Sequence, residues 1–138
     1  MLKYLLDTNI VVYVMKRRPV EVLQIFNQQS TRMAISAITL SELFHGAEKS
    51  MHVSANLLAI EDFCGRLEVL PYGPKASQHY GAIRSSLEKI GTPIGVNDLH
   101  IAGHARSEGL ILVTHNVSEF ARVPALQVEN WTATLQAQ

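Results

Sequence analysis

The sequence predicts an α/β fold in which a mostly parallel central sheet of about four to five strands is flanked by helices. Short apolar runs alternate along the chain with longer amphipathic segments, which is the order expected when strands are connected by helices. The clearest runs are apolar throughout, as in strands that are covered on both faces. Ligands in such folds bind beyond the carboxyl ends of the strands, so the chemistry is expected at that edge.

Five short segments are expected to form the strands. KYLL at residues 3–6 and MAIS at Met33–Ser36 are apolar enough to be buried, and EVL at Glu68–Leu70 is a third short candidate. LILV at residues 110–113 is the clearest buried strand in the chain. Residues 127–129 are expected to form a last strand at the sheet edge.

Six longer segments are expected to be helices, and capping residues, proline or glycine mark several of their ends. Thr8 and Asn9 are good capping residues for the first helix, and Pro19 suits the start of the second. Gly91 is placed to cap a long helix, and Gly109 to stop the next one. The expected helices span residues 10–15, 20–29, 39–50, 55–67, 74–90 and 97–108.

Length and composition predict a single domain over residues 1–132, followed by a frayed tail at residues 133–138. Of the 138 residues, 47% are hydrophobic and 17% are charged, which is typical of a globular protein. The single cysteine, Cys64, excludes an internal disulfide framework and a cysteine-cluster zinc site. No apolar run approaches the roughly 20 residues of a membrane span, and Asp7 interrupts the first apolar stretch, so we expect a cytoplasmic protein without a signal peptide.

Three acidic residues fall where a predicted strand ends or a predicted helix begins. Asp7 follows the first strand directly, whereas Glu42 and Asp98 lie in the first turns of their helices. Each position also has a purely structural explanation. Asp7 could cap a helix, and Glu42 could close a capping box with Thr39. Asp98 could serve only to complement the helix dipole.

A fourth polar group follows the strand at residues 110–113. Thr114 and Asn116 lie at its carboxyl end, and Glu119 falls in a short helix that follows. The structural alternative is a polar loop in which Asn116 or Ser118 caps that helix.

Acidic side chains gathered at one edge of a sheet would repel one another, and a divalent cation would relieve the repulsion. Oxygen ligands select Mg²⁺ or Mn²⁺ over zinc, and a carboxylate cluster that holds such ions is typical of phosphodiester cleavage. His100 and His104 have the i, i+4 spacing of a zinc site, but the sequence offers no evident third ligand.

The ordered set of these blocks resembles the PIN-domain ribonucleases, and more narrowly the VapC-type toxins of bacterial toxin–antitoxin pairs. The resemblance extends from residue 2 to residue 131, and it implies a PIN-like fold. The matching blocks are LLDTN (5–9), SAITLSELFHGAEKS (36–50), GTPIGVNDLHIAGHA (91–105), VTHNVSEF (113–120) and VENW (128–131).

The resemblance implies that Asp7, Glu42 and Asp98 are the catalytic residues. Asp7 and Asp98 match the direct Mg²⁺ ligands of the family, and Mn²⁺ is expected to be able to replace Mg²⁺. Many PIN domains carry a fourth acid where this chain has Asn116, which keeps an oxygen ligand but loses a charge. Glu119 could supply that acid from the next turn, so Glu42, Asn116 and Glu119 are further candidate metal ligands.

Four polar side chains are expected to orient the carboxylates or bind phosphate: Thr8, Asn9, Thr114 and Asn116. In the expected mechanism, Mg²⁺ polarises the scissile phosphate and activates a water, while Glu42 orients that water or accepts its proton. Because attack by water needs no 2′-hydroxyl, the products should carry 5′-phosphate and 3′-hydroxyl ends.

The resemblance also implies an RNA substrate. The chain looks most like the enterobacterial VapC branch, whose members cut initiator tRNA in the anticodon stem-loop and so inhibit translation. The 12 basic and 12 acidic residues cancel, which argues against a broad nucleic-acid-coating surface. RNA must then be attracted by local cations, of which Lys16, Arg17 and Arg18 form the densest group. A solvated helix end explains each of these three residues equally well.

A toxin of this type implies two protein partners. One is a cognate VapB-type antitoxin whose tail lies across the active-site groove and places a basic side chain among the carboxylates. The other is a second copy of the chain, in a homodimer that joins a larger toxin–antitoxin assembly. No membrane partner is expected.

Two other classes of function compete with this interpretation. One is a catalytically silent PIN-type module that binds RNA, which the presence of all three main acids disfavours. The other is a DNA-directed nuclease or a small phosphatase with the same metal site. Divalent-dependent cleavage separates an enzyme from a binding module, and parallel RNA and single-stranded DNA substrates separate the two nucleases.

Overall fold

The computed structural model describes residues 1–132, and the expected tail at residues 133–138 lies outside the described residues. Its strands form one sheet in the order β3-β2-β1-β4-β5, and every pairing in it is parallel. The predicted α/β class and the parallel sheet are therefore confirmed. The strands are β1 (Tyr4–Leu6), β2 (Met33–Ser36), β3 (Glu68–Leu70), β4 (Ile111–Val113) and β5 (Val128–Glu129).

The helices lie close to the predicted segments, although most boundaries shift by one to three residues. The first helix begins at Thr8 rather than residue 10 because Asp7 is its N-cap, and the third begins at Ala37 because Ser36 is its N-cap. Gly91 and Gly109 both adopt positive φ angles just past helix ends, as predicted. The helices are α1 (Thr8–Lys16), α2 (Val20–Gln28), α3 (Ala37–Glu48), α4 (Val53–Cys64), α5 (Pro74–Lys89), α6 (Val96–Glu108) and α7 (Val117–Phe120).

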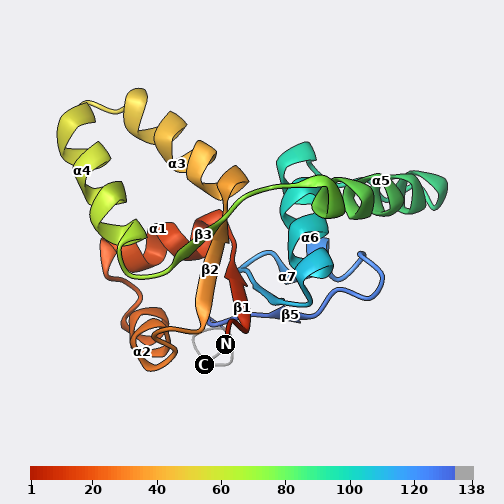
Figure 1. Ribbon diagram of the computed structural model, residues 1–138, viewed down its shortest axis with the longest axis horizontal. Coiled ribbons are helices and arrows are strands. Elements are labelled where there is room, and N and C mark those ends of the chain that lie inside the picture. Colours follow the sequence, from red (N-terminus) through yellow and green to blue (C-terminus); the bar gives the residue numbers. More distant parts are fainter. Residues whose placement is uncertain (133–138) are drawn as a thin grey trace.

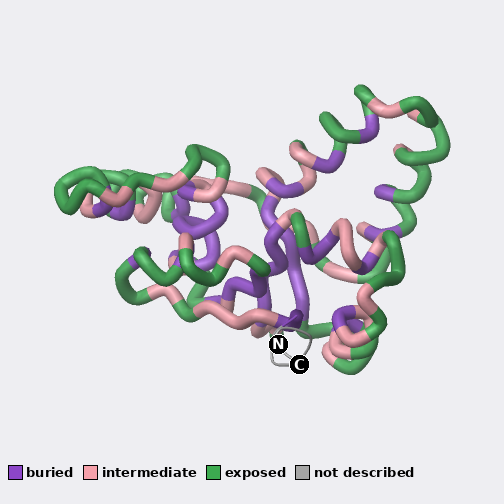
Figure 2. The backbone as a smooth tube through the Cα atoms, turned by 180° about the vertical axis from the view of Figure 1, so that it is seen from behind, coloured by how far each residue is buried: buried purple, intermediate pink, exposed green. Residues whose placement is uncertain are grey.

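The helices divide between the two faces of the sheet. Figure 1 shows α1 to α4 on one side of the strands and α5 and α6 on the other. Successive side chains of a strand point to opposite faces. Accordingly, Leu6 and Val113 pack in the core beneath α1 to α4, whereas Leu5 and Leu112 pack against α5 and α6. Figure 2 shows this buried centre and the exposed outer helices. Burial on both faces is the physical reason why these strands are apolar throughout.

Helices α5 and α6 pack closely, and Gly103 permits their approach. A Cβ atom at Gly103 would lie 2.9 Å from the backbone nitrogen of Tyr80 and 3.1 Å from the carbonyl oxygen of Ala76. Both neighbours are backbone atoms of α5, so they cannot rotate away. Gly103 is thus the point at which α6, the helix that carries Asp98, rests on its neighbour.

We expect Gly103→Ala to lower the free energy of unfolding by about 1–3 kcal/mol, because the added methyl group forces α5 and α6 apart. Gly81→Ala in α5 is the matched control, since nothing lies within 4 Å of the corresponding Cβ position. The control should stabilise the helix by about 0.5–1 kcal/mol. Urea unfolding of both variants checks this. Equal stabilities of the two variants would contradict the close approach at Gly103.

The sheet order brings three chain segments to one edge. Strand β1 is central, with β2 and β4 as its neighbours. Since the strands are parallel, the segments that leave β1, β2 and β4 all start at the same edge of the sheet, and they lead into α1, α3 and α7. None of the helices within residues 1–132 is long and apolar enough to cross a membrane.

Candidate active site

Asp7 lies at the carboxyl end of β1 and is almost fully buried, with 3% of its surface exposed. Its Oδ1 atom accepts a hydrogen bond of 2.8 Å from the backbone nitrogen of Thr8. Its Oδ2 atom accepts one of 2.8 Å from the Thr114 hydroxyl. Asp7 is therefore the N-cap of α1, as the structural alternative predicted. The two bonds also fix the orientation of its carboxylate.

Glu42 in α3 does not form the capping box that the sequence suggested. The N-cap of α3 is Ser36, whose hydroxyl accepts from the Ile38 backbone nitrogen at 3.1 Å, and Thr39 lies inside the helix. Glu42 instead accepts a hydrogen bond of 2.6 Å from the Thr8 hydroxyl at the start of α1. This contact directs the carboxylate of Glu42 toward the residue next to Asp7.

Asp98 is half-buried in the first turn of α6, where its charge also suits the helix dipole. It shares a hydrogen bond with Glu119 of α7. Glu119 also accepts a long hydrogen bond of 3.5 Å from the backbone nitrogen of Gly95, which precedes α6. Glu119 thus belongs to a short helix, as predicted, and supports the start of α6.

A cavity of about 210 Å³ joins these residues at the sheet edge. Its lining comes from the starts of α1 and α6, from α3, and from the loop after β4. Thr114 and Glu119 are not among the lining residues, although each bonds to a carboxylate that is. The lining residues are Asp7, Thr8, Asn9, Glu42, Asp98 and Asn116.

The electrostatics of the cavity are dominated by negative charge. Burial raises the pKa of Asp7, the hydrogen bonds from Thr114 and Thr8 lower it, and the charges of Glu42 and Glu119 raise it further. Burial and then the charge of Glu119 raise the pKa of Asp98 to about 7, with smaller contributions from Asp7 and Glu42. The charges with the largest effect on both groups are all carboxylates, so a bound cation would relieve their repulsion.

The donor set suits a hydrated hard cation. Carboxylate and amide oxygens surround the cavity, and these are the ligands of Mg²⁺ and Mn²⁺. Within residues 1–132, no group of three His, Cys, Asp or Glu side chains is already arranged to hold a metal by itself. Mg²⁺ does not require such a cage, because it usually keeps several waters and takes one or two carboxylates. The residues therefore fit Mg²⁺ with part of its water shell.

His100 and His104 do not form a zinc site. The Nδ1 atom of His100 lies 2.7 Å from the Tyr72 hydroxyl, whereas Nδ1 of His104 lies 2.8 Å from the Ser36 hydroxyl. The two rings thus serve different contacts within the protein. The His104 contact ties α6 to the residue that caps α3, a link that the sequence analysis did not anticipate.

A groove of about 600 Å³ adjoins the cavity and shares Thr8 and Glu42 with it. It runs between α1, α3 and α4, and sequence reasoning did not identify it because its lining comes from three separate helices. Apolar side chains such as Val12 and Leu43 form much of it, and Lys16 lies in its wall.

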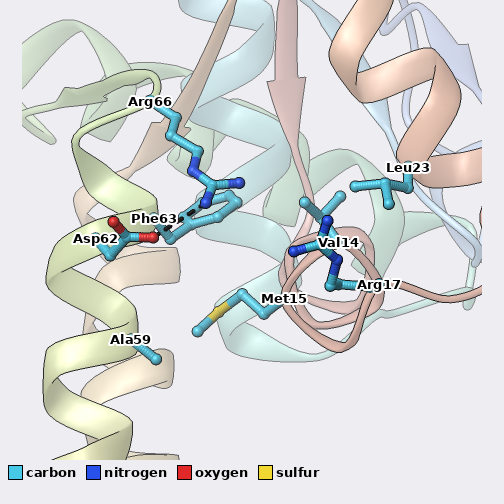
Figure 3. Close-up of a pocket in the computed structure, with 8 residues that line it drawn as sticks. All are labelled: Val14, Met15, Arg17, Leu23, Ala59, Asp62, Phe63 and Arg66. Atoms are coloured by element: carbon cyan, nitrogen blue, oxygen red, sulfur yellow. Dashed lines mark hydrogen bonds and ion pairs between the residues drawn. The ribbon is translucent and has the colours of Figure 1, made fainter.

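Lys16 and Arg17, two of the three basic residues expected to contact RNA, line different cavities. Lys16 lines the groove beside Glu42, whereas Arg17 lines a neighbouring cleft of about 200 Å³ between α1, α2 and α4, which shares Met15 and Ala59 with the groove. Figure 3 shows Arg17 on the α1 side of that cleft and the ion pair of Arg66 with Asp62 on the α4 side. Of the three residues, Lys16 is therefore the one that lies in the groove next to the carboxylates.

Comparisons of the sequence and of the structure with known proteins all point to the same protein family. A family model for the PIN domain matches residues 4–126. The chain is 58% identical over 131 residues to ribonuclease VapC2 of Haemophilus influenzae, an alignment that covers 95% of this chain and 99% of that protein. It is 48% identical, with the same coverage of both chains, to the tRNA(fMet)-specific endonuclease VapC of Salmonella typhimurium. The crystal structure of DNA-bound VapBC from Salmonella typhimurium matches with a TM-score of 0.91 over 95% of this chain and 99% of that chain, at 48% identity. The chain therefore belongs to the PIN-domain family, within its VapC ribonuclease branch.

Proposed function

We propose that this chain is the toxin of a VapB–VapC-type pair and a Mg²⁺-dependent endoribonuclease that cleaves tRNA and inhibits translation. One observation carries the catalytic part of this proposal. Three carboxylates and two amide side chains, from four segments of the chain, line one cavity at the carboxyl edge of a parallel sheet. Oxygen-ligated divalent ions in such sites are suited to phosphodiester hydrolysis.

Asp7 and Asp98 are proposed to hold the ion. Glu42 and Asn116 lie in the same cavity and are further candidate ligands, with Mn²⁺ as a substitute ion. Glu119 bonds to Asp98 and is better placed to orient that carboxylate than to bind the ion directly. The ion, when bound, would supply charge neutralisation at the scissile phosphate and activation of the attacking water.

Glu42 is proposed to accept the proton of the attacking water. The Thr8 hydroxyl donates a hydrogen bond of 2.6 Å to its Oε1 atom and so holds the carboxylate at the cavity wall. Thr114 holds Asp7 in the same manner. Asn9 and Asn116 line the cavity and can donate hydrogen bonds to phosphate oxygens. Attack by water leaves a 5′-phosphate and a 3′-hydroxyl.

The proposed substrate is initiator tRNA, cut in its anticodon stem-loop. The support is the 48% identity to a Salmonella relative that is named a tRNA(fMet)-specific endonuclease. Lys16 beside the carboxylates can contact the RNA backbone, since a lysine binds phosphate as a point charge. Arg17 and Arg18 are further candidates for contact with the RNA backbone.

The proposed partners are a VapB-type antitoxin and a second copy of the chain. The support for the antitoxin is the match to a VapBC complex of Salmonella typhimurium. The groove between α1, α3 and α4 suits an antitoxin segment, because it combines apolar walls with access to Glu42. Exposed apolar side chains on α3, on α4 and between them, namely Phe44, Met51 and Leu58, offer surface for contacts between copies.

Cleavage of a bacterial tRNA pool by the antitoxin-free protein tests the function. We expect discrete cuts in Mg²⁺ or Mn²⁺ and none in EDTA, and end mapping should find 5′-phosphates. Single-stranded DNA of the same sequence should resist cleavage. Folded protein that binds RNA but cuts nothing in Mg²⁺ would identify a binding module instead, and equal cleavage of the DNA would identify a nuclease without RNA preference.

Thr114 is expected to hold the carboxylate of Asp7 in the orientation that binds the ion. Its buried hydroxyl donates to Asp7 at 2.8 Å and accepts from the Asn116 backbone nitrogen at 3.0 Å. We expect Thr114→Val to weaken Mg²⁺ affinity or activity by about 10- to 100-fold, because partners that orient a ligand carboxylate have effects of this size. Titration of cleavage with Mg²⁺ measures it, and Thr114→Ser should restore it. An unchanged Mg²⁺ dependence in Thr114→Val would exclude this role.

A further inference from the structure

His115 lies directly beside the carboxylate cavity but has no place in the proposed chemistry. It stands between Thr114, which bonds to Asp7, and Asn116, which lines the cavity. Its imidazole is exposed, although both neighbours in sequence are at least partly buried. The side chain thus projects outward from the loop that forms one wall of the site.

The ring of His115 is positioned by Tyr13 of α1. The two rings meet edge to face, with centroids 6.1 Å apart and planes at 80°. Tyr13 lies one turn after Asn9, which lines the cavity, so the aromatic pair continues from the cavity along the same face of α1. An ordered and exposed aromatic ring therefore borders the site.

Three other histidines are held more tightly by hydrogen bonds within the fold. His79, His100 and His104 make contacts of 2.9, 2.7 and 2.8 Å to Arg106, Tyr72 and Ser36. His115 makes a longer contact of 3.4 Å, to the Thr132 hydroxyl. Burial and short hydrogen bonds do not account for a ring at this position.

RNA that binds at a cavity rich in carboxylates needs a favourable contact that does not depend on charge. The chain has no net charge, and the cavity carries several acids, so phosphate groups near it are attracted only weakly. Unpaired RNA bases stack on aromatic side chains, including histidine, and the energy of this stacking does not depend on the charge of the RNA backbone.

We propose that His115, backed by Tyr13, is a stacking platform for an unpaired base of the RNA next to the cleaved phosphate. This inference rests on the proposed ribonuclease function and adds a specificity-determining contact to it. It favours RNA whose cleavage site lies in an unpaired loop, because a paired base must first break its pairing and stacking to reach the platform.

Binding of an RNA stem-loop that contains the mapped cleavage site tests the proposal. The measurement uses fluorescence anisotropy in Mg²⁺, with Asp7→Asn in every protein so that the RNA stays intact. We expect His115→Ala to weaken binding by roughly 5- to 50-fold, as for the loss of one base–aromatic stack. His115→Phe should restore affinity, since it keeps a ring but no hydrogen-bonding group. His52→Ala, at an exposed histidine before α4, is the matched control.

RNAs with one abasic loop position each identify the stacked base. If the abasic position is the one whose base stacks on His115, the RNA should bind the His115→Ala protein and the protein with His115 equally well. This position is expected next to the cut. Added salt should leave the effect of His115→Ala unchanged, whereas it should shrink the effect of Lys16→Ala. The proposal is overturned if His115→Ala binds intact RNA normally, if phenylalanine fails to restore binding, or if the effect persists with every abasic RNA. In each of these cases cleavage by the wild-type protein still stands, so the proposed function is judged separately.

Discussion

Asp7→Asn is expected to lower the rate of RNA cleavage by at least about 100-fold while leaving the protein folded. Both oxygens of Asp7 are engaged, one by the Thr8 backbone and one by the Thr114 hydroxyl. An asparagine keeps the shape but loses the charge and one of the two acceptor contacts. The loss of charge weakens a proposed Mg²⁺ ligand, and this effect should exceed that of a lost supporting contact.

The stability of the same variant shows whether Asp7 serves structure or chemistry. The lost hydrogen bond should reduce the free energy of unfolding by about 1 kcal/mol, and removal of a buried charge should offset part of this. A near-normal melting temperature together with lost cleavage is the expected result. If Asp7→Asn cleaves as well as the wild type, Asp7 is only a helix cap.

Asp62→Asn is the matched control for both aspartates that line the cavity. The chain has three aspartates, and Asp62 is the one outside the cavity. Its side chain is 72% exposed and forms a surface ion pair with Arg66 at 3.1 Å. Such pairs contribute about 0–1 kcal/mol, so the variant should fold and cleave normally. This comparison separates the loss of an acid in the site from the loss of any aspartate.

Asp98→Asn is expected to reduce cleavage to a similar extent and, in addition, to change how stability depends on pH. Burial and the neighbouring acids raise the pKa of Asp98 from 3.8 to about 7 in the folded chain. Between these two pH values the folded state holds a proton that the unfolded state has released. The free energy of unfolding of the metal-free protein therefore falls as the pH rises through this window.

Melting temperatures in EDTA at pH values from 5 to 8 measure this effect. We expect the wild type to lose stability relative to Asp98→Asn as the pH rises, and we expect saturating Mg²⁺ to restore it. Burial lowers the pKa of His79, His100 and His104, which affects stability in the acid range, but both proteins share these groups. The difference between the two proteins thus reports on Asp98 together with the acids that interact with it. A difference that stays constant with pH would contradict the raised pKa.

Local patterns in the sequence predicted most of the elements and the sheet class. The apolar runs at β1, β2 and β4 could be recognised because strands covered on both faces need no polar residues. Glycines at helix ends and acids after strands are also local signals. Helix boundaries were less accurate, because α1 and α3 begin directly after their N-caps Asp7 and Ser36, two residues before the starts expected at residues 10 and 39.

Local sequence patterns were enough to show that acids and polar residues follow the strands of a parallel sheet, and hence which edge carries the candidate site. Which of these residues meet depends on how the chain packs in three dimensions. The bond from Thr8 to Glu42 joins residues 34 positions apart, and that from Thr114 to Asp7 joins residues 107 apart. The packing also placed Lys16 in the groove and Arg17 in the neighbouring cleft, and it brought His115 against Tyr13. Side-chain periodicity encodes only which face of its own element a residue occupies, whereas contacts between distant elements depend on how those elements pack.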